Sequence, residues 1–193
     1  MTTFFKCDLC DYKGSEGLMH MRKVHGTPMG QSYESITTDK PQADQVTENK
    51  MAPRITINRK IEFDAGHRVY RHESKCNNIH GHRYVVEIEC SGQLDSLGRV
   101  VDFSVIKSIF GKWIDDNLDH GMIVFKDDPI KFELESGALS GHKYFVMDSN
   151  PTAENLSEML YREATAQLKS LGIAVDSITV WETPNCRATY RQA

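Results

Sequence analysis

Three histidines in the middle of the chain constrain its fold and chemistry more than any other feature. They lie in the stretch FDAGHRVYRHESKCNNIHGHRYVVEIEC, as His67, His80 and His82. Residues 82–90 alternate between apolar and polar side chains, which predicts a strand. Side chains two positions apart on a strand point to the same face, so His80 and His82 lie together if the strand begins at His80. His67 follows an earlier predicted strand over residues 54–63 and would complete the group.

This histidine group has the composition of a catalytic metal site. Three imidazoles can bind a zinc ion and leave its fourth position open to water or substrate, whereas structural zinc is closed by four protein ligands. A single histidine of this kind is more often a loop residue or a hydrogen-bonded core side chain. Because three occur together, with the thiol of Cys76 between them, the residues alone predict a histidine-rich zinc site with a cysteine nearby.

Length, charge and cysteine content exclude several classes of protein. The 193 residues, 39% of them hydrophobic, suffice for one ordinary domain and a small additional module. A net charge of -4 argues against a general nucleic-acid or membrane binder. We expect a cytoplasmic protein, because no signal peptide and no run of roughly 20 apolar residues is present. Five cysteines in such a chain favour thiols used as ligands or nucleophiles over disulfides.

Residues 1–26 resemble a zinc finger of the two-cysteine, two-histidine kind. A two-residue spacer between Cys7 and Cys10 can fold both thiols around one ion, and His20 and His25 are about one helical turn apart. Only nine residues separate Cys10 from His20, where about twelve are usual. The shorter spacing departs from the standard hairpin and helix. The alternative is a tail that happens to contain these four residues, and the sequence does not indicate what the module binds.

The rest of the chain divides into a linker and a main domain. Residues 27–53 are polar, contain three prolines and show no periodicity, which is typical of a flexible linker. Residues 54–193 are interpreted as the main domain, with the predicted order strand, strand, helix, helix, strand. The last strand covers residues 173–182, and residues 143–147 are an extra strand candidate.

Two helices of the main domain are predicted from apolar side chains at helical spacing. The first begins after Asp102 or Ser104, either of which can cap it, and runs to Leu118. The second follows Pro151 and stops at Gly172. Both apolar stripes are assigned to the core and to no chemistry.

Five segments of the main domain occur in the order of a known family. They are FDAGH (63–67), CNNIHGH (76–82), GRVVDFSVIK (98–107), LDHGM (118–122) and NPTAENL (150–156) followed by VWETP (180–184). The main domain therefore resembles the 6-pyruvoyl-tetrahydropterin synthase and 6-carboxy-tetrahydropterin synthase family. The resemblance implies the tunnelling fold, an α+β fold with an antiparallel sheet and two helices on one face. It also implies that free sheet edges join between subunits, as a homohexamer built from trimers.

The resemblance assigns the reacting groups around a catalytic Zn²⁺ held by the three histidines. Cys76 matches the family's catalytic cysteine, and the neighbouring cation would favour its thiolate. Asp119 and His120 match an acid/base pair in which the carboxylate orients the imidazole. Taken alone, Cys76 is as well explained by an inert buried thiol, and the pair by a solvated helix end.

Substrate contacts are implied in the same way. Glu182 matches the family's pterin anchor, a carboxylate that accepts hydrogen bonds from the ring. Glu154 has two open interpretations, substrate binding and stabilisation of the first helical turn. The triphosphate of the substrate needs cations, for which there are four unranked candidates: Arg68, Arg71, Lys75 and Arg83.

The spacing within one motif separates activities in this family. Three residues lie between Cys76 and His80, which is similar to 6-carboxy-tetrahydropterin synthase, a lyase. The resemblance implies conversion of 7,8-dihydroneopterin triphosphate to 6-carboxy-tetrahydropterin, acetaldehyde and triphosphate, for 7-deazaguanine (queuosine-type) biosynthesis. Two alternatives stay open: 6-pyruvoyl-tetrahydropterin synthase activity, and a non-catalytic zinc-finger binding scaffold.

Overall fold

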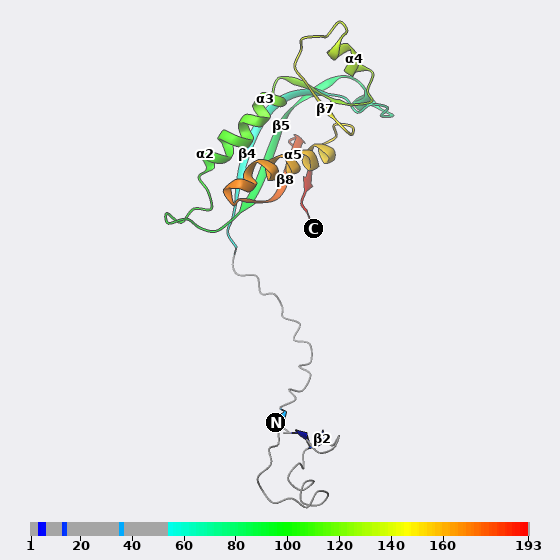
Figure 1. The fold of residues 1–193 in the computed structure, drawn as a ribbon. Helices are drawn as coiled ribbons and strands as arrows, with labels where there is room; N and C mark the ends of the chain where they lie inside the picture. Colours follow the sequence, from blue (N-terminus) through cyan, green and yellow to red (C-terminus); the bar gives the residue numbers. More distant parts are fainter. Residues whose placement is uncertain (1–3, 7–12, 15–34, 37–53, 193) are drawn as a thin grey trace, which may run out of the picture. The chain divides into compact units, whose positions relative to one another are not determined.

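The computed structural model describes four parts of the chain, residues 4–6, 13–14, 35–36 and 54–192 (Figure 1). The chain separates into two compact units, Met1–Lys50 and Met51–Ala193. The three histidines of the predicted catalytic site belong to the second unit.

The described part of the first unit is a small sheet. Its strands are β1 (Phe4–Lys6), β2 (Lys13–Gly14) and β3 (Ser35–Ile36), which pair in the antiparallel order β2-β1-β3. Strand β3 falls within the segment predicted as a linker. The four predicted finger ligands, Cys7, Cys10, His20 and His25, lie outside the described residues, so the finger stays a prediction.

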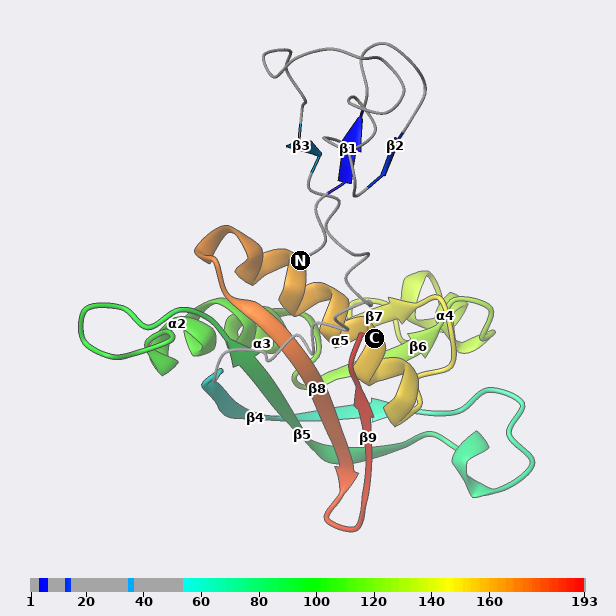
Figure 2. The same ribbon diagram turned by 90° about the horizontal axis from the view of Figure 1, so that it is seen from below.

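The second unit is built on a six-stranded mixed sheet in the order β7-β6-β4-β5-β8-β9 (Figure 2). The strands are β4 (Thr56–His67), β5 (His80–Ser91), β6 (Gly121–Phe125), β7 (Tyr144–Met147), β8 (Ala174–Thr183) and β9 (Cys186–Tyr190). Strands β4, β5, β8 and β9 are antiparallel neighbours, which confirms the predicted antiparallel sheet. Strands β6 and β7 extend it in the parallel sense.

Of these two parallel strands, β7 coincides with the predicted extra strand, while β6 was missed. Strand β6 pairs with β4 only at the end of β4, where residues 121–123 lie beside residues 65–67. The rest of β4 therefore has no strand on that side among the described residues.

The helices begin where side chains can cap them. The first runs without a break through α2 (Phe103–Ile106), a π-helical turn (Lys107–Gly111) and α3 (Lys112–Asn117). Asp102 caps it by accepting a 2.8 Å hydrogen bond from the Ser104 amide. Helix α5 (Ala153–Leu168) is capped by Thr152, and a 3-10 turn (Lys169–Leu171) leads to Gly172 in the left-handed conformation. Both predicted helices are confirmed, and a short helix α4 (Ile130–Glu135) is added.

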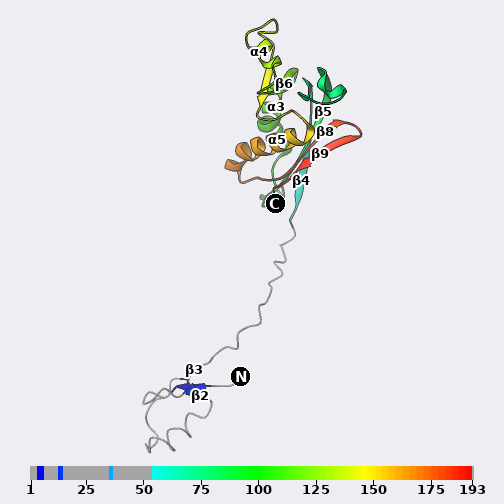
Figure 3. The same ribbon diagram turned by 90° about the vertical axis from the view of Figure 1, so that its right-hand side faces the viewer.

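The core lies between one face of the sheet and the helices, which are seen on the same side of the sheet in Figure 3. Buried side chains from the sheet include Phe63, Tyr84, Val86 and Ile88, and those from the helices include Ile106, Phe110, Leu156 and Leu160. Alternation along β4 and β5 places His67 and His82 on this same helix-facing side. Among the described residues, no helix combines the length and apolarity needed to cross a membrane.

Candidate metal centre

The antiparallel pairing of β4 and β5 brings the three histidines together. His67 is the last residue of β4 and lies directly opposite His80, the first residue of β5. His82 is two positions further along β5 and shares the face of His80. Gly81 lies between them, and an added Cβ there would lie 3.0 Å from the Ala65 carbonyl oxygen. The close approach of the two backbones therefore favours glycine at this position.

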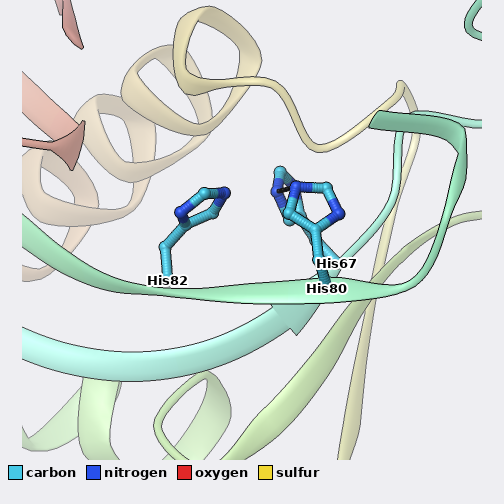
Figure 4. Close-up of side chains that lie close together, drawn as sticks. All are labelled: His67, His80 and His82. Atoms are coloured by element: carbon cyan, nitrogen blue, oxygen red, sulfur yellow. Dashed lines mark hydrogen bonds between the residues drawn. The ribbon is translucent and has the colours of Figure 1, made fainter. Parts of the chain in front are cut away.

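The imidazoles converge on one point above the strands (Figure 4). One ring nitrogen from each of His67, His80 and His82 lies within 4.8 Å of the other two. The Nε2 atoms of His67 and His80 are 3.1 Å apart. Two nitrogens bound to one tetrahedral zinc are roughly 3.3–3.4 Å apart, given zinc–nitrogen bonds of about 2.0–2.1 Å, so this spacing fits a shared ion.

Hydrogen bonds to backbone carbonyls orient two of these rings. His67 Nδ1 lies 2.8 Å from the carbonyl oxygen of Pro151, and His80 Nδ1 lies 2.8 Å from that of Asn78. A carbonyl only accepts, so both Nδ1 atoms carry the proton and donate it. In the neutral rings both Nε2 atoms then hold lone pairs that face each other. A cation between them turns this repulsion into coordination, and an outer hydrogen bond on Nδ1 is typical of metal-binding histidines.

His82 and Glu182 also have an arrangement that suits a bound cation. His82 Nε2 is buried and has no hydrogen-bond partner among the described residues. The Oε1 atom of Glu182 lies 3.3 Å from His67 Nε2 and 3.6 Å from His82 Nε2. The carboxylate and the His67 Nε2 atom are both acceptors, because His67 Nδ1 carries the proton, so their convergence fits a bound cation. The residues present therefore suit a metal ion, and nitrogen-rich ligand sets suit zinc among others.

Burial keeps the imidazoles of His67 and His82 neutral. Removal from water lowers the pKa of His67 to about 4, which the hydrogen bond to Pro151 only partly opposes. Burial also lowers the pKa of His82, against the opposing effect of the Glu182 carboxylate. Because a metal binds the neutral imidazole, both rings are ready for coordination at neutral pH.

The lowered pKa of His67 predicts how the metal-free protein responds to acid. The unfolded histidine has a pKa near 6.5, so below that value the unfolded state binds more protons than the folded state. The contribution of His67 to the free energy of unfolding should be constant above about pH 7.5 and about 2 kcal/mol lower at pH 5. Urea titrations with a chelator, followed by the fluorescence of Trp113 and Trp181, measure it. A flat profile across this range would contradict the assigned environment of His67.

The segment before α5 anchors the metal site. Asn150 accepts a 2.8 Å hydrogen bond from the Tyr70 amide and donates a 3.1 Å bond to the Tyr70 carbonyl. Asn155 donates to the Asn150 carbonyl at 2.8 Å. These bonds hold the Pro151 carbonyl against His67. Sequence reasoning missed this role, because the group that orients His67 is a backbone oxygen with no residue signature.

The predicted catalytic cysteine lies in the loop between the two histidine-bearing strands. Cys76 is part of a 3-10 turn (Lys75–Asn77) and is partly exposed. Its carbonyl accepts a 2.8 Å hydrogen bond from the Val69 amide, which closes the loop near the end of β4. Within the described part of the chain, its thiol makes no hydrogen bond. The catalytic role of Cys76 stays a prediction.

Asp119 and His120 form the predicted pair, with His120 Nδ1 2.7 Å from Asp119 Oδ2. Asp119 also accepts a 2.8 Å hydrogen bond from the Asp64 amide. Burial would raise the pKa of Asp119, but the hydrogen bonds from Asp64 and His120 outweigh it and lower that pKa. The His120 side chain is 78% exposed and lines a hollow together with Asp64 and Arg83.

Two of the side chains that line this hollow, Asp64 and Arg83, lie on the sheet face opposite to the three imidazole rings. Asp64 and Arg83 are odd steps along their strands from His67 and His82, so their side chains project to the opposite face. Asp119 and His120 are therefore not brought to the metal centre of their own chain.

The remaining predicted contacts fall into two groups. Glu154 is exposed in the first turn of α5, which leaves both of its interpretations open. Arg68 is paired with the buried carboxylate of Asp128, and its Nε donates at 2.7 Å. Arg83 is paired with Glu62 and Asp64 on the far face. The triphosphate candidates without a salt bridge among the described residues are Arg71 and Lys75.

Comparisons with known proteins place the chain in one family of tetrahydropterin synthases. Residues 56–193 match the family model described as 6-pyruvoyl tetrahydropterin synthase. The chain is 44% identical over 135 residues to a Rickettsia conorii protein named 6-carboxy-5,6,7,8-tetrahydropterin synthase, covering 68% of this chain and 96% of that protein. The Haemophilus influenzae protein of the same name is 30% identical over 141 residues, covering 70% and 98%.

Solved structures agree in fold. An uncharacterized protein from Wolinella succinogenes superimposes with a TM-score of 0.64 at 23% identity, covering 74% of this chain and 100% of that one. The 6-pyruvoyl tetrahydropterin synthase of Caenorhabditis elegans gives a TM-score of 0.53 at 23% identity, with coverage of 73% and 97%. At this identity the likeness extends to the fold alone, and it supports the predicted tunnelling fold.

Proposed function

Because the chain belongs to the 6-pyruvoyl tetrahydropterin synthase family, we propose that it is a zinc-dependent 6-carboxy-tetrahydropterin synthase. The reaction converts 7,8-dihydroneopterin triphosphate to 6-carboxy-5,6,7,8-tetrahydropterin, acetaldehyde and triphosphate, and the product serves 7-deazaguanine synthesis. The observation that carries the proposal is the convergence of three imidazoles within 4.8 Å, in a chain 44% identical to a protein of that name.

Each group of the centre has a chemical task in this proposal. His67, His80 and His82 would hold the zinc ion through Nε2. Bound zinc would polarise oxygens of the substrate side chain and make neighbouring C–H groups more acidic. Cys76 then accepts or returns a proton at those carbons. The Glu182 carboxylate accepts hydrogen bonds from the pterin amino group and the adjacent N–H, which fixes the ring.

We propose that Asp119 and His120 act on the substrate of a second copy of the chain. They lie on the face opposite to the histidine rings of their own chain, where His120 is exposed and Asp119 is partly buried. Two free sheet edges provide the means of assembly: the unpaired length of β4 and the short edge strand β9. A hollow of about 670 Å³ runs beside residues 59–63 of β4. Edge pairing in a homohexamer built from trimers would cover this otherwise open edge.

A second zinc ion is proposed for the N-terminal unit, held by Cys7, Cys10, His20 and His25. Strands β1 and β2 are antiparallel neighbours, and the chain that connects them carries both cysteines. A hairpin with this placement is typical of a two-cysteine, two-histidine finger.

Glu182→Gln should weaken pterin binding more than it disturbs the fold. The amide keeps the shape of the side chain but loses the charge-assisted, bidentate acceptance from the ring. A hydrogen bond to a charged group contributes about 1.5–3 kcal/mol, so KM should rise at least ~10-fold. Steady-state kinetics and a urea titration of both proteins measure the two effects. Kinetics equal to the parent would remove Glu182 from the substrate site.

Product analysis tests the proposed function directly. The full chain is loaded with zinc, supplied with 7,8-dihydroneopterin triphosphate, and its products are identified by mass spectrometry. Release of 6-carboxy-tetrahydropterin with acetaldehyde is expected. A 6-pyruvoyl product would instead favour 6-pyruvoyl-tetrahydropterin synthase activity. The solved Caenorhabditis elegans relative is named for that activity. No turnover at full zinc loading would leave the non-catalytic scaffold as the interpretation.

A further inference from the structure

Tyr84 holds a buried hydroxyl beside the metal centre that the proposed mechanism does not use. Its side chain is 0% exposed, and its hydroxyl has no hydrogen-bond partner among the described residues. A buried hydroxyl that has exchanged water for no partner destabilises a fold, whereas phenylalanine would fill the same space without that penalty. The position therefore suggests a partner that is made during function.

The surroundings of the ring place it against the metal ligands. The Tyr84 ring meets the rings of His67 and His82 edge-on, with centroids 5.9 and 5.6 Å away. On its other side it stacks on Phe63 at 5.0 Å. These contacts come from both central strands, so the ring cannot swing away without disturbing the core.

Tyr84 and Glu182 lie at the same end of the paired strands β5 and β8. Val86 lies opposite Val180, and Val85 lies opposite Trp181. Tyr84 and Glu182 are the next residues of the two strands, and each is two positions from a member of the pair Val86 and Val180, so they share its face. The carboxylate of Glu182 is on this face, because its Oε1 lies near the Nε2 atoms of His67 and His82.

In the proposed function, the Glu182 carboxylate can interact either with the bound cation or with the pterin ring. Its carboxylate lies next to the ligand nitrogens, where a bound cation would draw it in. As pterin anchor it must instead turn both oxygens to the ring. A carboxylate has about four lone-pair sites, so one further donor can hold it without blocking the pair that faces the pterin.

We propose that the Tyr84 hydroxyl is this donor, a positioning group that hydrogen-bonds the Glu182 carboxylate and keeps it directed at the pterin ring. This inference rests on the proposed function, since it assumes a pterin at Glu182. It assigns Tyr84 to ring recognition and to neither metal binding nor proton transfer.

The test compares Tyr84→Phe with Tyr161→Phe in the full chain. Tyr161 is a matched control, because it is also buried and its hydroxyl donates at 3.2 Å to the Val175 carbonyl, within the core. Three quantities are measured for each variant: binding of neopterin by fluorescence titration, zinc affinity by competition with a chelator, and the urea midpoint.

Tyr84→Phe should raise the Kd for neopterin and the KM about 10-fold, the effect of one hydrogen bond to a charged group. Its kcat and zinc affinity should match the parent, and its urea midpoint should be equal or higher, because the hydroxyl has no partner in the free protein. Tyr161→Phe should show the reverse, a lower urea midpoint with unchanged neopterin binding. In the Glu182→Gln background, Tyr84→Phe should add no further loss, because the group that it positions is already impaired.

The outcomes separate this inference from the proposed function. Parent-like neopterin binding by Tyr84→Phe would overturn it, and so would a loss of zinc affinity with intact neopterin binding. Full additivity with Glu182→Gln would also overturn it. If the parent forms 6-carboxy-tetrahydropterin while Tyr84→Phe behaves like the parent, only the inference fails. If the parent binds neopterin but yields no product, the proposed reaction fails while the binding comparison still tests Tyr84.

Discussion

Replacing His80 by alanine is expected to empty the catalytic metal site and stop turnover while the fold persists. His80 is partly exposed at the first position of β5, so its removal leaves no large cavity, unlike removal of His67, which is 1% exposed. Loss of a group that merely supports a metal ligand costs about 10–100-fold in affinity. Loss of the ligand itself should therefore weaken zinc binding by at least ~10²-fold, with turnover falling to the same degree.

Zinc content measured after dialysis, together with turnover, checks this expectation. The full chain should fall from two ions to one if the N-terminal unit holds the other. His142→Ala is the matched control, because His142 is exposed in the loop before β7, and it should keep both zinc and turnover. Full zinc and full activity in His80→Ala would show that the three imidazoles are not the catalytic ligands.

Cys76→Ala should abolish turnover by a different route, without loss of metal. The thiol is assigned to proton transfer, and its residue lies in the loop that joins the two histidine-bearing strands. A positioned general acid or base contributes about 10²–10⁴-fold to the rate, so a loss of at least ~10²-fold is expected. The variant should bind neopterin and zinc like the parent, because neither task is assigned to the thiol.

The exposed cysteine of β9 supplies the control. Cys186→Ala removes a thiol to which no part of the mechanism is assigned, so kcat should stay unchanged. Retained activity in Cys76→Ala would remove the thiol from the mechanism. Parallel loss of zinc and activity would instead indicate that the thiol acts through the metal.

Much of the fold could be predicted because its signals are local. Alternation of side chains identified β5, and with it the shared face of His80 and His82. Asp102 and Ser104 are both predicted as possible caps of the first helix, because a cap is formed by neighbours in sequence, and the structure shows Asp102 in that role. Strand β6 could not be found in this way. The run GMIVF is short and uniformly apolar, and β4, the strand it pairs with, lies far away in sequence.

In the candidate site too, some features could be predicted from the local sequence and others could not. The three histidines are identified by residue type, but the carbonyl that orients His67 belongs to Pro151, 84 residues away. Arg68 is a candidate for the triphosphate from residue type alone, and its pairing with the buried Asp128 appears only in the structure. Tyr84 fits the apolar face of β5, so the sequence pattern predicts a core position for it and no role for its hydroxyl. Contacts of this kind arise from tertiary packing, which residue spacing does not encode.

The pairing of His67 opposite His80 also gives the metal a part in folding. Slipping β5 by one residue against β4 would turn His80 and His82 to the other face of the sheet, away from His67. A metal ion that needs all three imidazoles can bind only the correct alignment, so its binding free energy is added to that alignment alone. The ion would thus select the correct alignment of the longest strand pair in the domain, favouring the native hairpin over its shifted competitors before any substrate arrives.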